Sequence, residues 1–136
     1  VAETGSVKVP TLFEMQSFET VHQLISTVEA RVREGINPVD VIQACFPMGS
    51  MTGAPKIPVM KTIDELENYK RGIYSGAIGY FKPNGDFDFN VVIRSAIIQG
   101  QRLIYPAGGA ITSDSEPAEE WEETQVKSRN ITNVYV

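Results

Sequence analysis

The chain has 136 residues, of which 42% are hydrophobic, a fraction that supports a packed core and argues against a disordered tail. Its formal net charge of −5 argues against a nucleic-acid partner, because nucleic acids select basic faces. No apolar run approaches the roughly 18–20 residues of a membrane span. The single cysteine, Cys45, excludes a disulfide within the chain and favours a cytoplasmic setting, and its apolar neighbours predict a buried thiol.

The first part of the chain is predicted to hold an extended piece followed by two helices. Residues 5–12 alternate weakly in polarity, as a short extended segment does. Apolar residues then recur at spacings of three and four, at Phe18, Val21, Ile25, Val28 and Val32. This spacing predicts an amphipathic helix that ends near Gly35. A second, short helix is predicted to begin at Pro38, with Asn37 as its cap.

The segment 46–56, FPMGSMTGAPK, is predicted to be a loop that leads into a helix. It contains two glycines and two prolines, and Pro55 suits the first turn of the helix that follows. Glycines let backbone amides approach a ligand, and a helix start adds unpaired donors. With the charge of Lys56, these donors predict an anion site. The alternative is an ordinary connection with a solvated lysine.

Beyond Gly72 the sequence pattern changes from helical to strand-like. Strands are predicted at residues 77–81, 87–99 and 102–105, as an antiparallel meander with a turn at 83–86. The last helix is predicted at 117–130. The order of these elements favours an α+β fold in which an antiparallel sheet packs with helices.

Two glutamates of the last helix are candidate metal ligands. Glu120 and Glu123, at i and i+3, share a helix face, and paired carboxylates suit Mg²⁺. Glu119 and Glu122 form a parallel pair, and helical spacing alone does not choose between the two pairs. A surface ion pair between Glu123 and Lys127 is the simpler alternative.

Arg94 and His22 are the other two side chains whose chemistry needs an explanation. Arg94 interrupts the apolar stretch FNVVIRSAII, so it either faces solvent or forms a clamp for a carboxylate. Tyr74 and the Gly108-Gly109 break could lie at the same end of the sheet. His22, the only histidine, falls in the first predicted helix and makes no transition-metal cluster by itself.

The chain resembles the chorismate-binding enzyme family through an ordered series of segments: FPMGSMTGAPK, RGIYSGAIGYF, FNVVIRSA, AGGAITSDSEP and EEWEETQVK. The family includes anthranilate synthase component I, aminodeoxychorismate synthase component I, isochorismate synthase and salicylate synthase. Each segment alone is a weak signal, whereas the ordered set is specific and covers nearly the whole chain. GSMTGAPK and DFDFNVVIRSA are more similar to aminodeoxychorismate synthases than to anthranilate synthases.

The resemblance implies roles for particular residues. Glu120 and Glu123 match the carboxylates that hold Mg²⁺, and Lys127 matches a lysine near the ring carboxylate of chorismate. His22 matches the family's active-site histidine and is the expected catalytic residue. Together with Lys127, the expected substrate-binding residues are Thr52, Lys56, Tyr74, Arg94, Gly108 and Gly109.

The activity implied by the resemblance is amination of chorismate to 4-amino-4-deoxychorismate, for para-aminobenzoate and folate synthesis, with ammonia from a glutamine amidotransferase subunit. The family's other acidic motif and its PIKGT-like segment belong upstream of Val1. We therefore expect residues 1–136 to be the C-terminal portion of the fold, without its N-terminal part and inactive alone. The alternatives are anthranilate synthase component I, or a non-catalytic fragment that only binds or self-associates.

Overall fold

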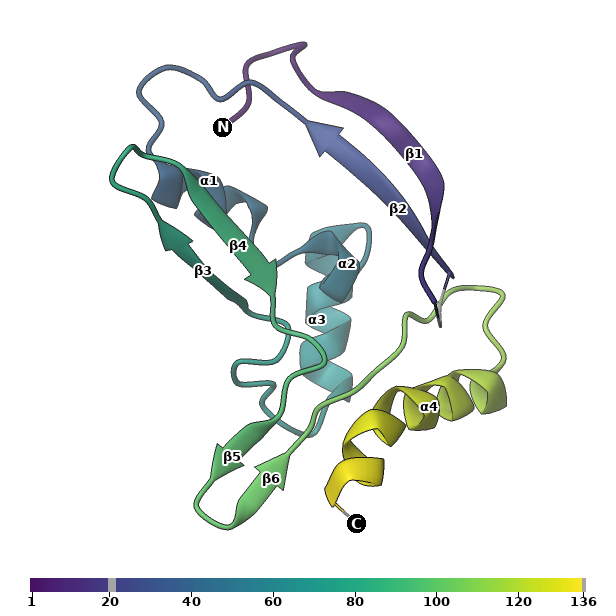
Figure 1. The fold of residues 1–136 in the computed structure, drawn as a ribbon. Coiled ribbons are helices and arrows are strands. Elements are labelled where there is room, and N and C mark those ends of the chain that lie inside the picture. The colour runs from purple at the N-terminus through teal and green to yellow at the C-terminus, as the bar shows by residue number, and fades with distance from the viewer. Residues whose placement is uncertain (20–21, 136) are drawn as a thin grey trace. The chain divides into compact units, whose positions relative to one another are not determined.

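The computed structural model describes residues 1–19 and 22–135 (Figure 1). It divides into two compact units, Val1–Cys45 and Phe46–Val136. The first unit contains the antiparallel strands β1 (Lys8–Ser17) and β2 (His22–Glu29), followed by helix α1 (Pro38–Cys45). In the described part of the chain, no helix is both long and apolar enough to cross a membrane.

The hairpin of β1 and β2 replaces the first predicted helix, so that prediction is wrong. Strand β2 carries Leu24 and Val28 on one face and Ile25 on the other, and this two-sided pattern coincides with helical spacing. Pairing with β1, from Lys8 opposite Glu29 to Ser17 opposite His22, satisfies the backbone in place of a helix. Val21, which the helix prediction included, lies outside the described residues.

Helix α1 follows its sequence signals closely. The Asn37 side-chain oxygen accepts the backbone N–H groups of Val39 and Asp40 at 2.9 and 3.1 Å, which confirms the predicted cap. The Asp40 carboxylate in turn accepts the Asn37 N–H at 3.1 Å. The helix ends at Cys45, whose side chain is exposed, so the prediction of a buried thiol is wrong.

The second unit alternates helices with short hairpins. Its elements are α2 (Gly49–Thr52), α3 (Lys56–Leu66), β3 (Ala77–Phe81), β4 (Phe87–Val91), β5 (Ile97–Gln99), β6 (Arg102–Ile104) and α4 (Pro117–Tyr135). Strand β3 pairs antiparallel with β4, and β5 pairs antiparallel with β6. The α+β class and its antiparallel pairing are confirmed. The predicted loop contains the short helix α2, and α3 begins directly after Pro55.

The predicted long strand 87–99 is interrupted, which divides the expected meander into separate hairpins. Val92 continues the ladder beyond β4, because its N–H donates to the Gly76 carbonyl and its carbonyl accepts the Ser75 N–H, both at 2.9 Å. The Ile93 N–H then donates to the Val91 carbonyl, so the chain leaves the ladder. Arg94 follows with φ +52°, a left-handed conformation that ends the strand.

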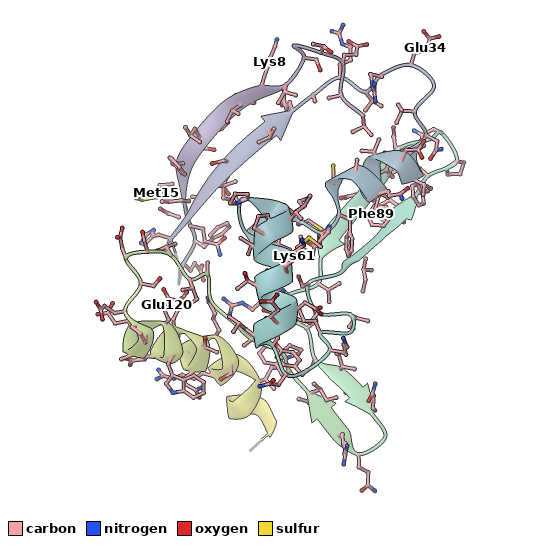
Figure 2. The ribbon with its side chains drawn as sticks, turned by 180° about the vertical axis from the view of Figure 1, so that it is seen from behind. Lys8, Met15, Glu34, Lys61, Phe89 and Glu120 are labelled. Carbon is pink, nitrogen blue, oxygen red and sulfur yellow. The ribbon has the colours of Figure 1, made fainter. Side chains whose placement is uncertain are left out.

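Few apolar side chains are buried in either unit. Val92, 6% exposed, is the buried hydrophobic residue of the described chain, whereas many large apolar side chains face solvent. The β3–β4 hairpin carries a cluster formed by Phe81, Phe87 and Phe89, with ring centroids 5.3–6.2 Å apart. Of these residues, Phe89 is labelled in Figure 2. Gly79 lies opposite Phe89, and a Cβ atom at Gly79 would collide with the Asp88 carbonyl oxygen and with Phe89.

Candidate functional site

The start of α4 holds one carboxylate in a defined orientation. Glu120 lies in the first turn and is half-buried (Figure 2). The Ser115 hydroxyl donates to Glu120 Oε1 at 2.6 Å. Glu120 Oε2 is buried and has no hydrogen-bond partner among the described residues. A buried carboxylate oxygen without a donor is costly, which indicates that this atom faces a place for a ligand.

Gly109 is the point on which the charged side chains of α4 converge. A Cβ atom added at Gly109 would lie 2.8 Å from Glu120 Oε2, 3.3 Å from Glu123 Oε2 and 4.0 Å from Lys127 Nζ. Glu119 and Glu122 are exposed, and so is Glu123, so the distances to Gly109 and not exposure distinguish the two pairs. The tertiary structure therefore brings the Glu120–Glu123 pair to the glycine break.

The donor set at Gly109 fits a Mg²⁺ ion. Two carboxylates against one ammonium leave a local negative charge, and Mg²⁺ usually takes one or two carboxylates and completes its shell with water and substrate oxygens. Within the described residues, no three His, Cys, Asp or Glu side chains form a metal-binding group.

Lys127 links α4 to the glycine break. Its Nζ forms an ion pair with Glu123 Oε1 at 2.7 Å, as the i,i+4 spacing predicts, and also donates to the Gly108 carbonyl at 3.1 Å. The Tyr74 hydroxyl lies 3.3 Å from the position of a Cβ at Gly108. One site thus brings together three separate parts of the chain: Tyr74, the Gly108-Gly109 break and Lys127.

Arg94 lies beside this site and not within a strand. Its side chain is exposed, so the cost of burying a guanidinium does not arise. Arg94 Nη1 donates to the backbone carbonyl of Lys127 at 3.4 Å, and the Tyr105 hydroxyl donates to the same carbonyl at 3.4 Å. A carboxylate clamp formed by Arg94 with Tyr74 stays a prediction.

A cleft of about 940 Å³ lies beside α3 and contains Thr52 and Tyr74 in its lining. The Thr52 hydroxyl donates to the Met48 carbonyl at 3.1 Å. The amides of Thr52 and Gly53 also bond within the loop, to Met48 and Gly49, so the predicted anion site loses these donors. Lys56 is the first residue of α3, and its substrate-binding role stays a prediction.

His22 is the first residue of β2, so its predicted place in a helix is wrong. It is exposed, and its Nδ1 lies 2.9 Å from the Ser17 hydroxyl of the paired strand. His22 belongs to the unit Val1–Cys45, whereas the other candidate residues belong to the unit Phe46–Val136. Its catalytic role stays a prediction.

Three residues at or near the site were missed by sequence reasoning. Ser115 orients Glu120, and Glu67 and Arg71 form an ion pair in the lining of the cleft. The i,i+4 spacing of Glu67 and Arg71 was a usable signal for the ion pair. Ser115 offered none, because its partner depends on how the loop enters the helix.

Comparison with known proteins shows that the chain belongs to the family described as chorismate binding enzyme, which matches residues 1–133. Among its relatives is the aminodeoxychorismate synthase of Streptomyces griseus, 54% identical over 127 residues. The chloroplastic aminodeoxychorismate synthase of Arabidopsis thaliana is 48% identical over 133 residues. Anthranilate synthase component 1 of Pseudomonas putida is 45% identical over 129 residues.

The matches cover nearly all of this chain but a small part of each relative. They span 93%, 98% and 95% of the chain, and 18%, 14% and 26% of the Streptomyces, Arabidopsis and Pseudomonas proteins. The crystal structure of anthranilate synthase component I from Streptococcus pneumoniae TIGR4 superposes with a TM-score of 0.88 at 40% identity. That alignment covers 97% of this chain and 30% of the other, and it confirms the fold.

Proposed function

We propose that this chain is the chorismate-binding C-terminal portion of an aminodeoxychorismate synthase. The observation that carries the proposal is the convergence of Glu120, Glu123 and Lys127 on Gly109, beside Tyr74 and Gly108. Identities of 54% and 48% to two aminodeoxychorismate synthases, against 45% to an anthranilate synthase, support this branch of the family. The reaction would replace the ring 4-hydroxyl of chorismate with ammonia.

The electrostatics of the site support a bound cation. Chorismate carries two carboxylates, and the two glutamates at Gly109 would repel either of them, since Lys127 already pairs with Glu123. Bound Mg²⁺ would offset this repulsion, hold the ring carboxylate and stabilise the charge that develops as the hydroxyl leaves. Glu120 Oε2 and Glu123 Oε2 would be its protein ligands.

The remaining residues would orient the substrate. The backbone at Gly108, with Tyr74 and Arg94, would hold the enolpyruvyl carboxylate, and Thr52 would line the ring side. Fixing both carboxylates of a rigid ring places the 4-position for attack, and such orientation contributes much of a bimolecular rate. The ammonia would come from a glutamine amidotransferase subunit, and the product would serve folate synthesis in the cytoplasm.

Product analysis tests the proposal. The full-length protein is incubated with chorismate, ammonium and Mg²⁺, and the products are separated by chromatography with mass detection. We expect 4-amino-4-deoxychorismate, and omission of Mg²⁺ should abolish its formation. Anthranilate as the product would favour the second candidate, an anthranilate synthase component I, which the Pseudomonas and Streptococcus relatives support. Failure to bind chorismate at all would reject both.

A further inference from the structure

The C-terminal end of α3 carries an ion pair that the proposed reaction does not use. Arg71 Nε donates to Glu67 Oε2 at 2.7 Å, and Arg71 Nη2 donates to Glu67 Oε1 at 2.5 Å. These two parallel bonds form the bidentate geometry that only a guanidinium provides. The Arg71 and Glu67 side chains are 23% and 25% exposed, so solvent screens this pair less than a surface pair.

The rest of the Arg71 guanidinium binds two other segments. Arg71 Nη1 donates to the Met51 carbonyl in α2 at 3.2 Å and to the Ser75 hydroxyl at 3.3 Å. The guanidinium carbon lies 5.9 Å from the centre of the Tyr74 ring. One planar group therefore joins α2, the end of α3 and the turn that precedes β3.

Two of these segments, α2 and the turn before β3, carry candidate substrate-binding residues. Met51 precedes Thr52 and Ser75 follows Tyr74, so both partners of Arg71 Nη1 adjoin a candidate residue, and Ser75 itself lines the cleft. Ser75 is 7% exposed and has φ +68°, a left-handed conformation that a non-glycine residue keeps only when its surroundings hold it. Its N–H bonds to the Val92 carbonyl and its hydroxyl accepts from Arg71, so the turn is fixed from two sides.

The pair remains charged over a wide pH range. The hydrogen bond from Arg71 lowers the pKa of the Glu67 carboxyl, and the same bond raises the pKa of Arg71. Lys82 and Asp86 form an exposed pair with the same i,i+4 spacing: their charged atoms lie 3.9 Å apart, and their side chains are 50% and 64% exposed.

We infer that Arg71 is a positioning residue, which holds Thr52 and Tyr74 at the separation that chorismate requires and is itself held in orientation by Glu67. The inference rests on the proposed function. Arg71 acts through the residues next to its hydrogen-bond partners, because its guanidinium, which lines the cleft, is engaged by Glu67, Met51 and Ser75. A misplacement of about 1 Å in a binding group can lower affinity or rate severely. Loss of the Arg71 contacts should therefore be seen first as weaker chorismate binding.

The inference is tested in the full-length protein with Arg71→Lys and Glu67→Gln, and Lys82→Ala is the matched control. Lysine keeps the charge but cannot make the two parallel bonds and also reach Met51 and Ser75. We expect both variants to raise the KM and Kd of chorismate about tenfold or more, with a smaller change in kcat and an unchanged Mg²⁺ affinity. Lys82→Ala should leave all four quantities unchanged.

A double-mutant cycle with Tyr74→Phe separates positioning from general stability. If Arg71 acts through Tyr74, the effects of Arg71→Lys and Tyr74→Phe on chorismate affinity are not additive. Additive effects, or a lower melting temperature with unchanged KM, would overturn the inference. If Arg71→Lys does not fold, Glu67→Gln answers the same question. A wild-type protein that does not bind chorismate refutes the proposed function as well, whereas normal wild-type binding with unchanged variants refutes only the role of Arg71.

Discussion

Replacing Ser115 with alanine removes the hydroxyl that donates to Glu120 Oε1 at 2.6 Å. In the wild type this hydrogen bond fixes the Glu120 carboxylate so that Oε2 points at Gly109. Without it the carboxylate is free to rotate, and cation binding has to restrict that rotation. A hydrogen bond to a charged group contributes about 1.5–3 kcal/mol, and partners that orient a metal ligand typically change metal affinity about 10–100-fold. Because Glu120 is half-buried, water can replace part of the lost bond, so we expect about tenfold weaker Mg²⁺ binding.

The assay is a calorimetric Mg²⁺ titration of the full-length protein with chorismate present, together with the Mg²⁺ dependence of product formation. Ser115→Thr keeps a hydroxyl and should restore most of the affinity. Ser113→Ala is the control, because Ser113 is exposed and its hydroxyl donates to Asp114 at 3.4 Å in the same loop. Mg²⁺ affinity within about threefold of wild type in Ser115→Ala would show that Ser115 does not orient a metal ligand.

Three further predictions concern the same site. Gly109→Ala should weaken Mg²⁺ binding about tenfold or more while the protein still folds, because the new Cβ, 2.8 Å from Glu120 Oε2, displaces only the end of a flexible side chain; metal titration and thermal unfolding check this, and unchanged affinity contradicts it. Glu123→Gln should remove most Mg²⁺-dependent activity and Glu122→Gln little, and equal losses in activity assays would show that the assignment of Glu120 and Glu123 as the site pair is wrong. Arg94→Lys should raise the Kd of chorismate about tenfold, because lysine cannot form two parallel bonds to a carboxylate; binding measurements with no change would leave Arg94 a purely structural contact to α4.

Local signals in the sequence determined several elements of this protein. Asn37 begins α1 because its side chain satisfies the first amides of the helix, a contact between residues two and three apart. Strand β3 has the predicted bounds, since the turn at 83–86 places it opposite β4. Helical spacing by itself places Glu120 and Glu123 on one face of α4.

The first predicted helix failed for an equally local reason. Apolar residues on both faces of a strand reproduce a spacing of three and four, so the pattern around Leu24, Ile25 and Val28 fits either structure. Pairing with β1 decides between the two, and that pairing is a contact between separate segments. The end of the strand before Arg94 is also decided by a contact between separate segments. Val92 is the last residue that pairs with the Ser75–Gly76 turn.

The resemblance to the chorismate-binding enzymes is visible in the sequence alone, because it depends only on the identity and order of residues along the chain. Only the tertiary structure decided which glutamates meet Gly109, that Lys127 reaches the Gly108 carbonyl, and that Ser115 holds Glu120. The physical reason is that periodicity reports which residues share a face of one element, whereas a site depends on how several elements pack, and packing is set by long-range contacts that no local pattern encodes.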